Sequence, residues 1–323
     1  MNKLPSLITT FALCTLLAAC GTDSSSGSAT SADSAATAPT PDVTVAGVSS
    51  SKPAFTLRLT DAPVDGVTAV VVSFTRVEVR NVDGAWTSYS LQTPQPIDLL
   101  ALQGSKTADL LVNMPLDAGE YDEIRLFVDE APMATYVGLG KAGAAQLEVK
   151  HGSSEGIKVK GNFSVSESRP VSLVLDFDLR KSIKIKKKTG EYELKAKLRL
   201  VERAGSGHIQ GTVDYSELIQ AAGCSDDDPD TFNAVYVFEG HNAKLEDIDL
   251  SKKKPKGPLS TTNIKYDSAT QSYMYEAAFL PAGDYTLAYT CNSNLDDLED
   301  DKDDLRFFGV RNATVVLNNI AFL

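Results

Sequence analysis

From Phe55 onward, apolar and polar residues alternate with a period of two in one short segment after another. Such alternation sends successive side chains to opposite faces of a β-strand, so each segment predicts a strand with one buried face. Turn signals rich in Gly, Pro and Asp separate these segments, which is typical of β-sandwiches and barrels. The expected strands are 55–59, 70–79, 97–102, 109–114, 123–129, 146–150, 156–159, 171–177, 183–186, 192–201, 209–213, 234–238, 263–266, 273–280, 284–290, 305–310, 314–317 and 320–323.

This pattern predicts an all-β chain, with a short helix at 216–222 as the one exception. About 270 residues carry it, which is long for one domain and comfortable for two. The segment that joins the two halves, Ala204-Gly205-Ser206-Gly207, is short and contains only small residues. We therefore expect two tandem β-sandwich domains of immunoglobulin or prealbumin type, one at 53–203 and a smaller one at 207–323.

One turn occurs in both halves of the chain. Leu116-Asp-Ala-Gly-Glu-Tyr121 and Leu280-Pro-Ala-Gly-Asp-Tyr285 share the same spacing. In each, a glycine turn delivers a tyrosine to the start of a strand, as in the tyrosine corner of sandwich domains. The repeat predicts two sandwiches of related design.

The N-terminal segment predicts export and a lipid anchor. Residues 1–19 have one lysine and then a short apolar run, as in a signal peptide. Leu17-Ala18-Ala19-Cys20 resembles the lipobox of bacterial lipoproteins, which implies acylation of Cys20 (a fatty-acid or palmitate modification) and attachment to a membrane; the alternative is a plain secretory signal. Gly21 after the cysteine favours the outer membrane over the inner. Residues 20–52, rich in Ser, Ala and Thr, predict a disordered tether.

Charge and cysteine content limit the partners and the chemistry. The net charge of −12 argues against nucleic acid as a partner and leaves a protein or a polysaccharide. Cys224 and Cys291, in an oxidising compartment, predict one disulfide, with two buried thiols as the alternative. The three histidines stand alone, so no zinc site is expected.

Several motifs of the first half carry a family resemblance. They are Leu59-Thr-Asp-Ala-Pro63, Val77-Glu-Val79, Gly84-Ala-Trp86, Ile97-Asp-Leu-Leu100, and Ala118-Gly-Glu-Tyr121 with Arg125-Leu126. In this order the motifs resemble the bacterial family catalogued as domain of unknown function 4382, over about residues 53–201. The resemblance implies a secreted or lipid-anchored envelope protein and no particular reaction. Residues 207–323 resemble transthyretin-like and carboxypeptidase-regulatory-like modules.

Acidic residues offer two candidate cation sites. Asp61, Asp65 and Asp129 either form a carboxylate cluster that holds calcium or stabilise tight turns with their own side chains. In the second half, acidic loops follow both cysteines, and a disulfide would bring these loops together. An irregular calcium site there would use Asp226, Asp228, Asp230, Asp297, Glu299 and Asp301; the alternative is a solvated acidic surface, and no other cofactor is expected.

The remaining signals do not predict an enzyme. Gly152-Ser-Ser-Glu-Gly156 satisfies the G-x-S-x-G pattern, but a strand rather than a helix follows it, so we expect a hairpin loop. The nine Lys and Arg of 180–199 are expected on outer strand faces, as a solvated edge or as a docking patch. Trp86, the only tryptophan, predicts either a core residue or a sugar-stacking platform. We expect no catalytic residues, and a non-catalytic envelope lipoprotein with a binding or scaffolding surface; the alternatives are a carbohydrate-binding accessory protein and a calcium-stabilised adhesion module.

Overall fold

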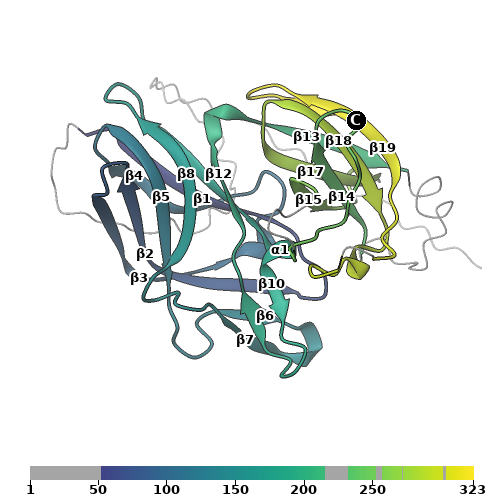
Figure 1. Ribbon diagram of the computed structural model, residues 1–323, viewed down its shortest axis with the longest axis horizontal. Helices are drawn as coiled ribbons and strands as arrows, with labels where there is room; N and C mark the ends of the chain where they lie inside the picture. Colours follow the sequence, from purple (N-terminus) through teal and green to yellow (C-terminus); the bar gives the residue numbers. More distant parts are fainter. Residues whose placement is uncertain (1–51, 215–231, 252–256, 271, 301–302) are drawn as a thin grey trace, which may run out of the picture. The chain divides into compact units, whose positions relative to one another are not determined.

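A computed structural model of the protein describes residues 52–214, 232–251, 257–270, 272–300 and 303–323. These residues form four β-sheets, so the predicted all-β class is confirmed. Figure 1 shows the strands of the second half, in green and yellow, as a group of their own. Within the described residues, no helix is both long and apolar enough to cross a membrane.

Two sheets are built from residues 54–202. The first, here called the β1 sheet, has the order β12 (Leu198–Glu202), β9 (Val171–Asp178), β1 (Ala54–Ala62) and β4 (Ala108–Pro115). The second, the β2 sheet, has the order β10 (Ile183–Ile185), β11 (Tyr192–Leu194), β7 (Ala144–Glu148), β6 (Tyr136–Gly138), β2 (Ala69–Asn81), β5 (Gly119–Val128) and β8 (Ile157–Val165), with β3 (Trp86–Asp98) paired to β2.

Two further sheets are built from residues 206–322. The β13 sheet has the order β16 (Lys265–Asp267), β17 (Ser272–Pro281), β13 (Ser206–Val213) and β20 (Ile320–Phe322). The β14 sheet has the order β15 (Ser260–Asn263), β14 (Ala234–Glu239), β18 (Gly283–Thr290) and β19 (Phe308–Val315). No described strand of one half pairs with a strand of the other, yet the described residues belong to one compact unit. The expected boundary between two domains therefore stays a prediction.

The alternation of apolar and polar residues explains why these segments form strands with one buried face. In β1, Phe55, Leu57 and Leu59 are fully buried and enter one large core with the valines of β2, whereas Arg58 between them reaches Asp109 at 2.7 Å. A separate core lies between the β13 and β14 sheets around residues such as Ile209, Val237 and Leu287. Each half thus buries the inward faces of its own two sheets, as in a β-sandwich.

The repeated turn has the predicted geometry in both halves. The Tyr121 hydroxyl donates to the Asp117 carbonyl at 2.8 Å, and the Tyr285 hydroxyl donates to the Pro281 carbonyl at 2.8 Å, four residues back in each case. Gly119 and Gly283 have φ angles of 154° and 158°. The two turns are therefore equivalent, and the predicted tyrosine corner is confirmed.

Several expected strands differ in the structure. The segments 305–310 and 314–317 contribute to one continuous strand, β19. The segment 97–102 ends as a short 3₁₀ turn, because the Asp98 side chain accepts from the Leu100 N–H and stops the strand. The segment 192–201 divides into β11 and β12, because the chain leaves the β2 sheet for the β1 sheet between them. The segment 263–266 divides at buried Ile264, where the chain passes between the β14 and β13 sheets.

Helices are minor among the described residues. The α-helix α1 (Leu179–Ser182) is one turn long, and the Asp178 side chain caps it by accepting from the Lys181 N–H. The helix expected at 216–222 lies outside the described residues.

Candidate functional site

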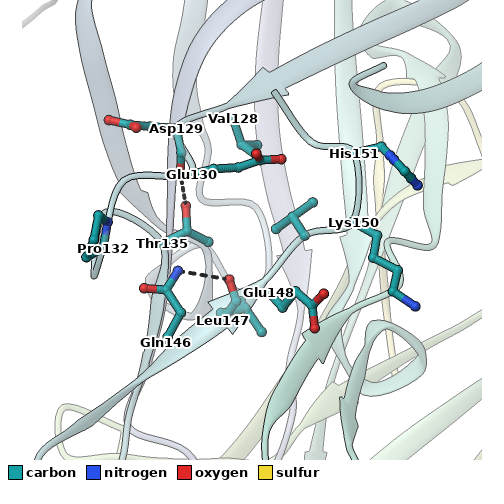
Figure 2. A pocket seen from close by; sticks show the side chains of 11 residues that line it. Val128, Asp129, Glu130, Pro132, Thr135, Gln146, Leu147, Glu148, Lys150 and His151 are labelled. Carbon is teal, nitrogen blue, oxygen red and sulfur yellow. Dashed lines mark hydrogen bonds between the residues drawn. The ribbon is translucent and has the colours of Figure 1, made fainter. Parts of the chain in front are cut away.

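A groove with both polar and apolar lining lies where β5 and β7 end (Figure 2). Its volume is about 740 Å³. One wall comes from the segment after β5, with Asp129 and Glu130. The other comes from the end of β7 at Glu148 and from the residues that follow it, up to His151. Val128, Leu147 and Val149 add apolar surface. A groove of this size with a few polar groups can hold a small ligand or a short segment of a polymer.

The polar groups of the groove are held by neighbours. The Ser153 N–H donates to Glu130 Oε1 at 2.9 Å, and the hydrogen bonds from the Ser153 side chain and backbone lower the pKa of Glu130. Lys186 Nζ lies 2.6 Å from Glu148 Oε2. Asp129 Oδ1 accepts from the Ala131 N–H at 2.9 Å. The groove therefore presents carboxylates whose positions are fixed by hydrogen bonds and an ion pair, and carboxylates accept hydrogen bonds from hydroxyl or amino groups.

The G-x-S-x-G segment borders this groove and is a loop. The Glu155 and Gly156 N–H groups both donate to the His151 carbonyl, at 2.8 and 3.1 Å, and β8 begins at Ile157. A nucleophile elbow needs a helix after the serine, so the segment lacks that geometry. The predicted hairpin is wrong, however, because β8 pairs with β5 whereas β7 pairs with β6 and β11. The expectation that the protein is not an enzyme stays a prediction.

The three aspartates of the first half do not form a cluster. Among the described residues, no group of three or more His, Cys, Asp and Glu side chains is placed to hold a metal ion. Asp65 pairs with Arg180 at 2.6 Å, and only Asp129 makes a local turn contact. Asp61 is buried in β1, and burial together with the charges of Asp176 and Asp178 raises its pKa well above the ordinary value. The turn interpretation is thus wrong for Asp61 and Asp65.

The second candidate cation site lies only partly within the described residues. Asp297 Oδ2 lies 3.3 Å from Lys187 Nζ, and Glu299 pairs with Lys184. These lysines would compete with calcium for the carboxylates. The remaining positions, Asp226, Asp228, Asp230 and Asp301, lie outside the described residues, so the calcium site stays a prediction.

The predicted disulfide also lies only partly within the described residues. Cys291 is buried at the end of β18, in the core of the second half. Cys224 and the lipobox Cys20 lie outside the described residues. Both the disulfide and the lipid modification stay predictions.

The basic segment 180–199 does not simply face solvent. Arg180 is buried, with 6% of its side chain exposed, and its guanidinium contacts Asp65 and the Asn263 side chain, the latter at 3.1 Å. Arg199 pairs with Asp176, also largely buried. Alternation along the segment could not reveal these contacts, because their acidic and amide partners lie far away in the sequence.

Trp86 lies outside both buried cores. It begins β3 opposite Arg80 of β2, and 37% of its surface is exposed. The Arg125 guanidinium lies 4.2 Å from the centre of the indole, and the Arg80 guanidinium lies 5.5 Å from it. The core interpretation is therefore wrong, because Trp86 packs on arginines of the outer sheet face.

Two solved structures show a distant likeness to this chain. The minor pilin GBS52 of the Gram-positive pathogen Streptococcus agalactiae is 10% identical, with a TM-score of 0.18, over 83% of this chain and 93% of that one. The fimbrial anchor protein Mfa2 of Porphyromonas gingivalis is 8% identical, with a TM-score of 0.17, over 80% and 82%. At such TM-scores the likenesses carry no argument about this protein.

Sequence comparison is more informative for the first half. None of the curated proteins is similar enough to be matched. Residues 52–196 match the family described as "Domain of unknown function (DUF4382)". This range contains the five motifs noted above, together with the groove and the outer face around Trp86. The match to the DUF4382 family over residues 52–196 therefore confirms the resemblance that these motifs predicted.

Proposed function

We propose that the protein is a non-catalytic lipoprotein of the cell envelope, anchored through Cys20, whose β-sandwich body binds a partner or ligand. The observation that carries this proposal is Leu17-Ala18-Ala19-Cys20, small residues and a cysteine directly after an apolar run. One acyl chain alone binds a membrane weakly, so the two or three chains of a bacterial lipoprotein would supply a stable anchor.

The described structure supports the binding part of the proposal. The groove at the ends of β5 and β7 and the outer face around Trp86 both present side chains that are fixed by ion pairs and hydrogen bonds. Fixed polar groups reduce the entropy that a surface loses when it binds. Gly21 supports the outer membrane as the location, and the acidic net charge argues against nucleic acid as the partner.

The anchor is tested by mass spectrometry of the native N-terminus and by membrane fractionation. We expect an acylated Cys20 as the first residue and the protein in the membrane fraction. The Cys20→Ala variant should lose the acyl chains and their membrane attachment. Cys14→Ala, within the apolar run, is the matched control and should remain acylated. An unmodified Cys20, or cleavage at another residue, would remove the anchor from this account.

A further inference from the structure

The outer face of the β2 sheet carries an exposed aromatic ring on a fixed charged support. Cross-strand pairing places Trp86 beside Arg80, Arg80 beside Glu123, and Glu123 beside Lys160 in one row. The adjacent row holds Ser88, Glu78, Arg125 and Lys158. Trp86 is the only tryptophan of the chain and stands at the end of its row.

Acidic side chains of β5 hold the two arginines beside the Trp86 ring in place. Glu123 has only 4% of its side chain exposed and lies 3.2 Å from Arg80 and 2.7 Å from Arg125. Arg80 also donates two hydrogen bonds to Asp122, at 2.9 and 3.0 Å. Two-pronged pairs of this kind fix the guanidinium plane as well as its position. Because both guanidiniums approach the indole, its orientation is set before any ligand arrives.

Most charges of this support are paired. Arg80 and Arg125 face Asp122 and Glu123. Lys158 pairs with Glu155, and Glu78 pairs with Arg76. With Lys160 in the same row, the patch offers paired donors and acceptors and has little net charge. The chain as a whole is strongly acidic and would repel an acidic polymer. An apolar ring face beside paired hydrogen-bonding groups suits a ligand with apolar C–H faces and a rim of neutral hydroxyl groups.

We propose that this face binds a neutral polysaccharide, with one sugar ring stacked on Trp86 and its hydroxyl groups hydrogen-bonded to the Arg80–Asp122 pair. The proposal rests on the binding role proposed above and names its ligand class, but it does not depend on the lipid anchor. A protein that lacks acyl chains would disprove the anchor and leave this site intact. A protein that is anchored but ignores polysaccharides would disprove this site alone.

Tryptophan fluorescence tests the proposal directly, because all indole emission of this chain comes from residue 86. The full chain, purified in detergent, is titrated with soluble glucan, mannan and xylan, and with alginate as an acidic comparison. We expect at least one neutral polysaccharide to shift the emission to shorter wavelength, with little effect of added salt. No shift with any neutral polysaccharide, or a shift with alginate alone that salt abolishes, would overturn the proposal.

Variants then locate the site by affinity electrophoresis in the polysaccharide that binds. Trp86→Ala should weaken association by about tenfold, which corresponds to about 1.4 kcal/mol, because the variant lacks the ring on which the sugar stacks. Trp86→Phe should restore part of the binding. Arg80→Lys keeps the charge but loses the two-pronged contact and should weaken binding severalfold.

The matched control is Tyr266→Ala, which removes an exposed aromatic ring from β16 in the other half of the chain. It should bind as the native protein does. Unchanged far-ultraviolet circular dichroism and thermal midpoint of each variant would show that the fold is retained. Native affinity in a folded Trp86→Ala variant would refute the site.

Discussion

Asp296 shows how a single buried carboxyl group can make stability depend on pH. It accepts from the Tyr236 hydroxyl at 2.6 Å and from the Ile248 N–H at 3.2 Å. Burial raises its pKa to about 6, although these two hydrogen bonds and the charge of Arg180 oppose the shift. The folded protein therefore holds a proton on Asp296 at a pH where the unfolded chain has lost it.

We predict that this group lowers the free energy of unfolding as the pH rises from about 4 to about 6. In that window the native state binds more protons than the unfolded state, so the slope of stability against pH is negative. Because the pKa of Asp296 rises from 3.8 to about 6, the change in the free energy of unfolding is at most about 3 kcal/mol. Urea unfolding across this range measures it, with Asp296→Asn as the comparison. The variant should lose this part of the pH dependence, and an unchanged slope would contradict the prediction.

Whether the role of a residue could be predicted depended on how far away in the sequence its partner lies. The Tyr121 corner was predictable, because its acceptor is four residues away and the glycine turn marks it. The burial of Arg180 was not, because Asp65 and Asn263 reach it from 115 and 83 residues away. Of the two alternatives for Trp86, the core position is wrong: a lone aromatic residue is usually buried, and no local sequence pattern marks the packing of this ring on Arg125.

At the scale of elements, the repeated turn gives a paired prediction. Tyr121→Phe and Tyr285→Phe each remove one hydroxyl and its hydrogen bond to a backbone carbonyl. We expect each variant to lower the free energy of unfolding by about 1 kcal/mol. Tyr266→Phe, whose ring is exposed on β16, should have no measurable effect and serves as the control. Denaturant unfolding measures these free energies. A lower free energy of unfolding in only one of the two variants would show that the turns are not energetically equivalent.

Strands were predictable wherever alternation accompanied burial, as in β1, β2 and β9. The first eleven residues of β3 were missed because most of them are polar and exposed, and the segment contains Pro94 and Pro96. Proline is tolerated there because β3 pairs with β2 alone and so lies at an edge. The groove of Figure 2 was also missed, because it depends on which loops meet at the ends of β5 and β7.

At the scale of the whole molecule, Arg180 connects the two pairs of sheets. Its guanidinium lies 2.6 Å from Asp65, and the Ser293 hydroxyl donates to the same carboxylate at 2.7 Å. Nearby, Lys181 Nζ donates to the Pro258 carbonyl at 2.8 Å. Removing one partner of a buried ion pair leaves an uncompensated charge, which is far more costly than losing a surface pair.

We therefore predict that Arg180→Ala lowers the free energy of unfolding by about 3–5 kcal/mol. Arg169→Ala is the control, because Arg169 is 75% exposed and 3.9 Å from Glu202, and its loss should cost less than about 1 kcal/mol. The double variant Arg180→Met with Asp65→Leu, which leaves no unpaired charge, should recover much of the loss. Calorimetry of all four proteins checks this, and equal effects of Arg180→Ala and Arg169→Ala would show that the buried pair contributes little.

The parallel pairing of β1 with β9 also governs when the protein can fold. Arg58 of β1 donates to the Ser172 hydroxyl of β9 across 114 residues of sequence, and β13 likewise pairs with the much later β20. The entropy of closing such long loops is lost before the contacts form, so folding in milliseconds to seconds is expected, rather than microseconds. For a protein exported as proposed, slow folding is useful. A chain that has not yet paired β1 with β9 is still unfolded and can cross a membrane as an extended chain.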